Sequence, residues 1–186
     1  MSKYRPVKRV ALLANLKSNA PPAMSATSDV WDELDTETTI EAILAALRAN
    51  GYQAEFMEAQ LQPPHDLVAG LRSFGPDLCF NIAEGHRGTS REAHVPALLE
   101  MLRLPYTASP VLPLALALDK PMTKRVLAYH DLPTPEFQVF SNVDEELNDD
   151  LVDGDELRFP LFLKPSREGT GMGVAGRNIR SEEHTS

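Results

Sequence analysis

Short apolar runs alternate with helical patterns over the first hundred residues of this 186-residue chain. Each apolar run has the length of a strand, and each helical pattern is long enough to cross from one strand to the next. This alternation indicates βαβ units and a parallel sheet, and therefore the α/β fold class with a Rossmann-like N-terminal domain. The expected strands are 7–14, 52–58 and 77–82, and the expected helices are 35–50, 65–74 and 92–103.

The expected helix over 35–50 carries the clearest local signals. Acidic residues crowd its start, and Gly51 ends it. Thr38 and Glu41 have the spacing of a capping box within it. The apolar side chains that share one face are Ile40, Ile43, Leu44 and Leu47.

The pattern changes after residue 106, and we place a domain boundary near residues 115–121. Residues 107–113 bear prolines and are expected to be irregular, whereas 114–130 is helical with a break at Pro121. Two further strands are expected at 137–140 and 159–164.

Acidic residues outnumber basic ones, 27 to 18, and eight of the acids lie in residues 144–156. That segment is expected to be a solvated surface excursion. Without a basic stripe, and with 6% aromatics, the sequence supports no nucleic-acid partner. It has no apolar run of membrane-spanning length, and the single cysteine, Cys79, excludes an internal disulfide. We take a cytoplasmic location as the default.

A lysine followed by a glycine-rich turn, in the stretch FLKPSREGTGMGV (162–174), is the most informative motif. Glycines let the backbone approach a ligand closely, and successive N–H groups in such a turn bind anions. Lys164 adds a positive charge and Thr170 a hydroxyl, which together suit a polyphosphate. The alternative is an ordinary glycine-rich hairpin turn.

Two more polar groups stand out. Lys120 and Lys124 are four residues apart and share a helix face, although a solvated helix edge would look the same. The loop after the strand at 77–82 lies where α/β sheets bind ligands, outside the carboxyl ends of the strands. Its polar residues are Glu84, His86, Arg87, Ser90 and Arg91, and a plain loop histidine is the alternative for His86.

These stretches, in this order, resemble the ATP-grasp superfamily, and within it the D-alanine–D-alanine ligases and their close relatives. The resemblance continues through LLEMLRLPYTAS (98–109), LALALDKPMTK (114–124), LPTPEF (132–137) and FPLFLKPSREGTGMGV (159–174). It implies an N-terminal substrate-side domain over 7–115 and the incomplete start of an ATP-grasp domain over 116–179.

The resemblance also implies a chemistry. ATP would activate a carboxylate as an acyl phosphate, an amine would attack it, and Mg²⁺ would help to neutralise the phosphates. The substrate would be a small amino acid or peptide, in peptidoglycan synthesis, and a homodimer is left open. Lys120 and Lys164 match the lysines that contact ATP phosphates. His86 matches a histidine of the substrate loop and is the expected catalytic residue. The flexible glycine-rich loop is matched by Gly169, Thr170, Gly171, Met172 and Gly173.

The sequence also departs from this family. The early Gly-Gly-x-Ser-x-Glu loop is missing, and Glu33 or Asp32 is the candidate to replace its glutamate. The family's His-Gly-x-x-Gly-Glu-Asp-Gly loop is replaced by EGHRGTSREA, which favours an amino acid or peptide carboxylate other than D-alanine. No Mg²⁺ ligands follow the glycine-rich stretch.

Residues 180–186 (RSEEHTS) have codons compatible with a sequencing adapter, so we expect a non-native tail on a truncated chain. The chain would then be the N-terminal part of an ATP-dependent carboxylate–amine ligase, and inactive alone. The alternative function is a non-catalytic α/β module that binds a ligand or serves as a scaffold.

Overall fold

The computed structural model describes residues 6–22, 31–62, 64–153, 157–169 and 171–181. The chain divides into two compact units, Met1–Leu118 and Asp119–Ser186, and each is described by itself. The division lies within the window of 115–121 in which the sequence places a boundary. No observation tests the finer domain ranges expected from the sequence, which therefore remain predictions: 7–115, 116–179 and 180–186.

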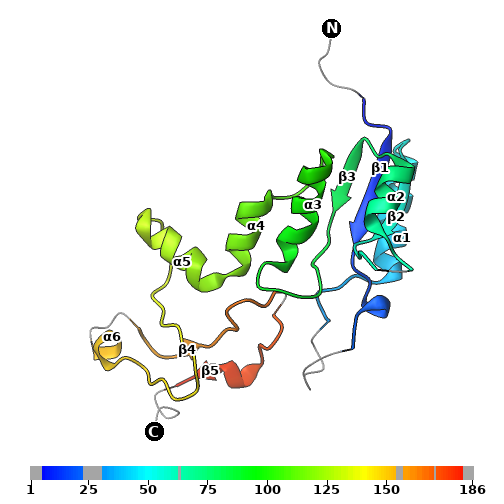
Figure 1. Cartoon of the computed structure of the whole chain (residues 1–186). Coiled ribbons are helices and arrows are strands. Elements are labelled where there is room, and N and C mark those ends of the chain that lie inside the picture. Colours follow the sequence, from blue (N-terminus) through cyan, green and yellow to red (C-terminus); the bar gives the residue numbers. More distant parts are fainter. Residues whose placement is uncertain (1–5, 23–30, 63, 154–156, 170, 182–186) are drawn as a thin grey trace. The chain divides into compact units, whose positions relative to one another are not determined.

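A parallel three-stranded sheet with the order β2-β1-β3 forms the centre of the first unit (Figure 1). Its strands are β1 (Arg9–Ala14), β2 (Gln53–Glu58) and β3 (Leu78–Asn81). All three expected strands are therefore confirmed. Cys79 of β3 also forms an isolated parallel bridge with Tyr106, in the segment after α3.

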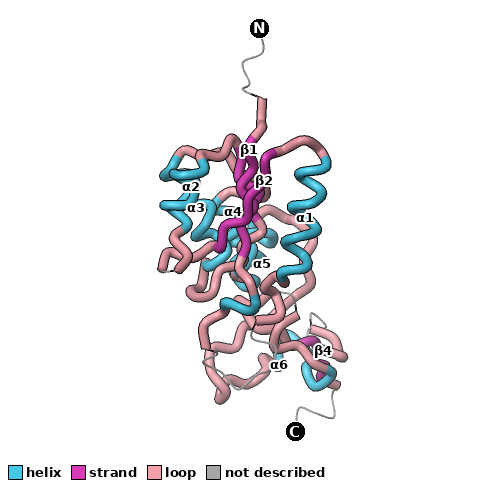
Figure 2. Tube along the Cα trace, turned by 90° about the vertical axis from the view of Figure 1, so that its right-hand side faces the viewer, coloured by secondary structure: helices cyan, strands magenta, loops and turns pink. Residues whose placement is uncertain are grey.

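Helices cover both faces of this sheet (Figure 2). On one face, Leu12 and Ala14 pack against α1 (Glu37–Ala49) through Ile40 and Leu44. On the other, Ala11 and Leu13 pack against α2 (Leu67–Phe74) and α3 (His94–Leu102). Successive side chains of a strand point to opposite faces, so β1 contributes to two separate cores. The apolar face expected for α1 lies in the core.

The start of α1 differs from the expected one. Asp35 forms a bridge with Leu16, which holds it extended, and the helix begins two residues later. Thr36 is the N-cap, and its hydroxyl accepts a hydrogen bond from the Thr39 N–H at 3.3 Å. The capping box expected from Thr38 is therefore wrong, because this residue already lies inside the first turn.

The helical region before and after Asp119 is also shifted. A helix, α4 (Val111–Leu118), begins within the stretch expected to be irregular, since Pro113 is tolerated in its first turn. The break falls at Asp119 rather than at Pro121. Asp119 caps α5 (Lys120–Tyr129) by accepting a hydrogen bond from the Met122 N–H at 3.0 Å.

The second unit has little regular structure. The strand expected at 137–140 is wrong, because Gln138 bonds instead with its side chain to the Glu146 carbonyl and the Asn148 N–H. The strand expected at 159–164 shortens to β4 (Leu161–Phe162), which pairs antiparallel with β5 (Ile179–Arg180). The second unit also contains α6 (Asp149–Asp153) and the 3₁₀ turn Gly176–Asn178. The 3₁₀ turns Lys17–Asn19 and Arg91–Ala93 belong to the first unit.

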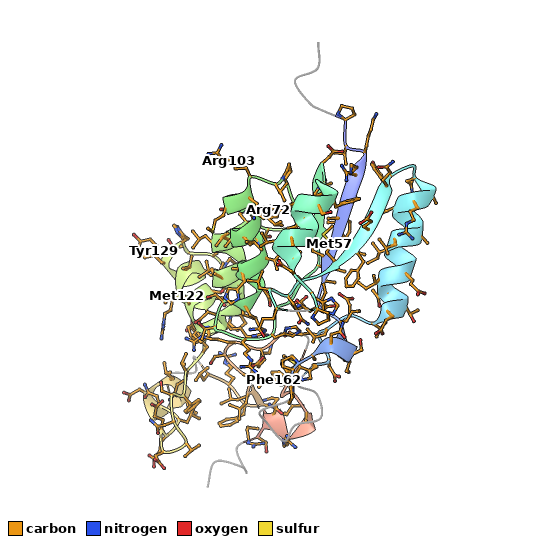
Figure 3. All side chains as sticks on the ribbon, turned by 45° about the vertical axis from the view of Figure 1, so that its right-hand side comes forward. Met57, Arg72, Arg103, Met122, Tyr129 and Phe162 are labelled. Carbon is orange, nitrogen blue, oxygen red and sulfur yellow. The ribbon has the colours of Figure 1, made fainter. Side chains whose placement is uncertain are left out.

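The two cores predict where truncation destabilises the first unit. Leu99 on α3 is 0% exposed within the core that also holds Leu13 and Leu71, and Met57 packs against this core (Figure 3). We expect Leu99→Ala to lower the free energy of unfolding by about 2–5 kcal/mol, because it leaves a cavity. Urea unfolding followed by circular dichroism measures this.

The control is Met101→Ala on the same helix, because Met101 is 82% exposed. Its effect should stay within about 0.5 kcal/mol. Equal losses for the two variants would mean that α3 does not pack on the sheet through Leu99.

Candidate functional site

A polar residue lies at the carboxyl end of each of the three parallel strands. Asn15 comes after β1, Glu58 is the last residue of β2, and Asn81 is the last residue of β3. The register aligns these ends, since Ala14 pairs with Glu58 and Leu13 with Asn81. In an open α/β sheet this carboxyl edge is where ligands bind.

All three residues are buried, and Asn15 and Glu58 connect the loops of the edge. Asn15, 1% exposed, accepts a hydrogen bond from the Gly85 N–H at 2.8 Å and donates one to the Ala59 carbonyl at 3.1 Å. Glu58 accepts hydrogen bonds from the Leu16 N–H at 2.9 Å and from the Asn19 side chain at 3.2 Å. Neither was among the residues expected in the site, although each is a polar residue at the carboxyl end of an expected strand.

An ion pair between Glu33 and Arg91 lies in the same first unit. The Arg91 Nη2 and Nε atoms donate to Glu33 Oε1 at 2.7 and 3.1 Å. The Arg91 and Glu33 side chains are only 8% and 3% exposed. Burying two charges is tolerable because each compensates the other, and losing either partner would leave a buried charge.

The structure separates the two candidate acids. Asp32 is 51% exposed and pairs with Lys17 at 2.5 Å, so its charge is already compensated at the surface. Glu33 is buried, and its second oxygen, Oε2, has no hydrogen-bond partner among the described residues. An unpaired buried carboxylate oxygen is costly unless a ligand supplies the donor. Of the two acids, Glu33 is therefore the one with a buried carboxylate oxygen that the described residues leave unpaired.

His86 has a comparable unpaired atom. Its Nε2 is buried without a partner in the described part of the chain, and its ring meets Trp31 edge to face at 5.7 Å between centroids. Burial lowers the pKa of His86, Glu58 opposes this shift, and Arg87 adds to it. An imidazole with a lowered pKa and an unpaired ring nitrogen can hold a polar group of a ligand.

Glu84 lies in the same loop as His86. Burial raises its pKa to about 7, with smaller contributions from Glu92, Glu33 and Asp35 that outweigh the opposing Arg91. Perturbed carboxyl groups gather at functional sites, and this one titrates near neutrality. Two of the loop residues expected in the site, Glu84 and Arg91, thus share one electrostatic environment with Glu33.

In the second unit, the start of α5 is tied to the segment after Lys164. The Lys120 N–H donates to the Ser166 carbonyl at 3.0 Å, and its ammonium group donates to the Glu168 carbonyl. Asp119 accepts a hydrogen bond from Arg167 at 2.8 Å. The structure therefore brings together Lys120 and the segment that leads into the glycines.

The glycine-rich stretch itself combines open and tight positions. Gly171 has a φ of +77°, and a Cβ there would meet no atom within 4 Å. Gly173 has a φ of +69°, and a Cβ would lie 2.9 Å from the Pro165 side chain. Met172 between them is buried, and the Lys164 ammonium lies 5.3 Å from the centre of the Phe162 ring. Thr170 lies outside the described residues.

Lys124 does not join this arrangement. Its ammonium group donates to the Thr134 hydroxyl at 2.9 Å and to the Pro135 carbonyl at 2.5 Å. It also lies 4.9 Å from the centre of the Phe137 ring. These contacts assign Lys124 to holding the connector after α5.

The described part of the chain provides no candidate for a metal site or for a membrane span. Within the described ranges, no three His, Cys, Asp or Glu side chains are grouped so that they could hold a metal ion. The same residues include no helix with the length and hydropathy needed to span a membrane.

Curated proteins with similar sequences include D-alanine–D-alanine ligases. No family model matches the chain. The D-alanine–D-alanine ligase of Cupriavidus metallidurans is 40% identical over 133 residues, which are 71% of this chain and 37% of that protein. The ligase of Moorella thermoacetica is 35% identical over 138 residues, 72% of this chain and 42% of that protein.

Solved structures show the same fold. A D-alanine–D-alanine ligase from Bacillus anthracis, complexed with ATP, superimposes with a TM-score of 0.57 at 23% identity. A second structure of the ligase from this organism gives 0.59 at 24% identity. They cover 87% and 90% of this chain, which covers 48% of each of them.

Sequence similarity to these ligases over about 71% of this chain, together with the parallel α/β sheet, places the chain in the ATP-grasp class. Within that class, the chain belongs with the D-alanine–D-alanine ligases and their close relatives. It spans about two fifths of the length of the curated relatives that it matches.

The buried ion pair generates a stability prediction. We expect Arg91→Met to lower the free energy of unfolding by about 3–5 kcal/mol, because it strands the buried Glu33 carboxylate. Adding Glu33→Gln should recover part of this loss. The exposed pair supplies the control, since Lys17→Met should change stability by less than about 1 kcal/mol. Urea unfolding of Arg91→Met, Glu33→Gln, the double variant and Lys17→Met measures the coupling, and a strictly additive double variant would contradict it.

The raised pKa of Glu84 generates a pH prediction. The unfolded chain loses this proton near the ordinary value of 4.5, whereas the folded protein keeps it to about pH 7. Stability is therefore lost as pH rises through this window. We expect Glu84→Gln to stabilise the protein at pH 8 by about 1–2 kcal/mol, since solvent screens a partly exposed group.

The gain from Glu84→Gln should disappear at pH 4. Matched urea unfolding at the two pH values tests this, with Glu41→Gln on the exposed face of α1 as the control. A gain that does not depend on pH would show that Glu84 ionises normally.

Proposed function

We propose that this chain is part of an ATP-dependent carboxylate–amine ligase that acts on small amino acids or peptides. The observation that carries the proposal is the tie between Lys120 and the segment 166–168. Through this tie Lys120, which we propose as the second phosphate-binding residue, contacts the segment that follows Lys164. The relatives named D-alanine–D-alanine ligase support it.

In the proposed reaction, a substrate carboxylate oxygen attacks the γ-phosphorus of ATP, and ADP leaves. The amine of a second substrate then attacks the carbonyl carbon of the acyl phosphate, loses a proton and displaces phosphate. The charge on the transferring group must be neutralised during the first step. Lys120 and Lys164 supply positive charge, and the amides of the glycine-rich stretch supply donors.

ATP fits the residues that are present. The open space above Gly171 lets a polyphosphate approach the backbone, and two lysines belong to the same unit. Mg²⁺ does not fit the described residues, since they contain no group of ligands for it. The proposed reaction therefore has no step through the metal, which would in such a ligase help to neutralise the phosphates.

The substrate side of the proposal rests on the unpaired buried atoms. Glu33 Oε2 would accept a hydrogen bond from the substrate ammonium, and His86 Nε2 would bind a neighbouring polar group. Arg91 in place of an acid changes the charge next to Glu33, which favours an amino acid or peptide other than D-alanine. A role in peptidoglycan synthesis, a cytoplasmic location and a homodimer are further parts of the proposal.

The test uses the protein that contains this chain at the full length of its relatives. We expect Lys164→Ala to weaken ATP binding about 10- to 100-fold, because it removes a charge-assisted contact to phosphate. Isothermal titration with ATP measures the affinity, and a coupled assay for ADP release with candidate amino acids measures turnover.

Lys124→Met is the matched control, since its ammonium group already binds Thr134 and Pro135. It should leave ATP affinity unchanged. Unaltered ATP affinity in Lys164→Ala would refute the nucleotide-binding role of the stretch and leave a non-catalytic α/β module.

A further inference from the structure

The loop that carries His86 is held at one backbone position, Gly85. The Gly85 N–H donates to the side-chain oxygen of Asn15 at 2.8 Å. Asn15 is 1% exposed, and its amide group also donates to the Ala59 carbonyl at 3.1 Å. One buried side chain therefore joins the ends of β1 and β2 to the loop after β3.

The other side of Gly85 is closed by Arg91. A Cβ at Gly85 would lie 2.7 Å from the Arg91 carbonyl oxygen and 3.0 Å from its carbonyl carbon. Gly85 also has a φ of +73°, a conformation that favours glycine. Gly85, directly before His86, thus binds the Asn15 side chain and packs closely against the main chain of Arg91.

The imidazole of His86 has little else to set its position. Its Nε2 has no hydrogen-bond partner among the described residues, and its ring contacts Trp31 edge to face. A ring without a hydrogen bond at that atom is placed by its backbone and by packing. Both depend on where the peptide after Gly85 is held.

We infer that Asn15 is a positioning residue for His86, acting through the Gly85 N–H. Asn15 presents the ring to the site at the carboxyl edge and keeps it buried against Trp31. What His86 does to a substrate rests on the proposed function, but its placement by Asn15 does not. A substrate-binding histidine gains from this arrangement because its loop is already ordered before the ligand arrives.

The first test uses the unchanged chain. The amide of Gly85 should exchange its hydrogen at least about tenfold more slowly than those of Arg87 and Gly88, which follow in the same loop. Residue-resolved hydrogen exchange by NMR measures this. Equal rates at the three positions would overturn the inference, whatever the variants show.

The second test uses two variants that break the contact from opposite sides. Asn15→Leu removes the acceptor, and Gly85→Ala pushes the loop away from Arg91. In both, we expect the NMR titration midpoint of His86 to rise toward that of an exposed imidazole, because its burial is reduced. Glu58 and Arg87, the charges that act on His86, remain in both. The resonance is assigned by its loss in His86→Gln.

Trp31 gives an independent readout, because it is the only tryptophan in the chain. Its emission should shift in both variants as the ring contact with His86 is lost. The matched control is Gly51→Ala, where φ is +85° but a Cβ would meet no atom within 4 Å. This variant suffers the same kind of backbone strain far from the loop, so it should lower stability without changing either signal.

Folded Asn15→Leu and Gly85→Ala variants with an unaltered His86 titration and Trp31 emission would refute the inference. So would a Gly51→Ala variant that changed both signals to the same degree, because the effect would then reflect stability alone. Where neither loop variant folds, the exchange rate of Gly85 in the unchanged chain decides. None of these measurements needs a nucleotide, so their outcome is separate from that of the ligase proposal.

Discussion

The burial of β1 on both faces is the constraint on which the first unit depends. The strand pairs with β2 on one side and β3 on the other, and its alternating side chains enter two different cores. A strand with no solvent-facing side must be apolar along its length, which explains the run from Val10 to Ala14. The same pairing aligns the ends of three strands, so that the polar residues after them meet at one edge.

That edge accumulates buried polar groups at a cost in stability. Glu58 is satisfied by the loop after β1, and Glu33 is half satisfied by Arg91. The raised pKa of Glu84 and the lowered pKa of His86 both reflect burial. A protein tolerates such groups where a ligand completes them, and among the described residues the buried Glu33 Oε2 and His86 Nε2 atoms have no hydrogen-bond partner.

The second unit is held by side-chain contacts to the main chain more than by a sheet. Asp119 uses one oxygen to cap α5 and the other to bind Arg167, and these contacts lower its pKa. Lys120 contacts the Ser166 and Glu168 carbonyls beside it. A segment held at one end by a helix start, and rich in glycine at the other, combines a fixed position with a backbone open to a ligand.

Local pattern was sufficient for the three strands and for the existence of α1, α2 and α3, whereas Lys120, Lys164 and His86 became candidates through the family resemblance. Period-2 and period-3.6 apolar spacing arises from the geometry of a single strand or helix, so it can be read without knowing what packs against it. The exact start of α1 could not be read in this way, because the bridge of Asp35 to Leu16 joins segments that the sequence does not connect. The strand expected at 137–140 failed for the same reason, since strand formation needs a partner and Gln138 found the acidic loop instead.

Tertiary structure alone decided which polar residues act together. Glu33 and Asp32 are neighbours in sequence, yet one is buried with an unpaired oxygen and the other is a surface ion pair. Asn15 and Gly85 are 70 residues apart, and only the parallel pairing of β1 with β3 brings them within a hydrogen bond. Sequence determined the periodic elements and the chemistry available at their ends. Burial and long-range contact depend on the packed chain, and these selected the groups that form a site.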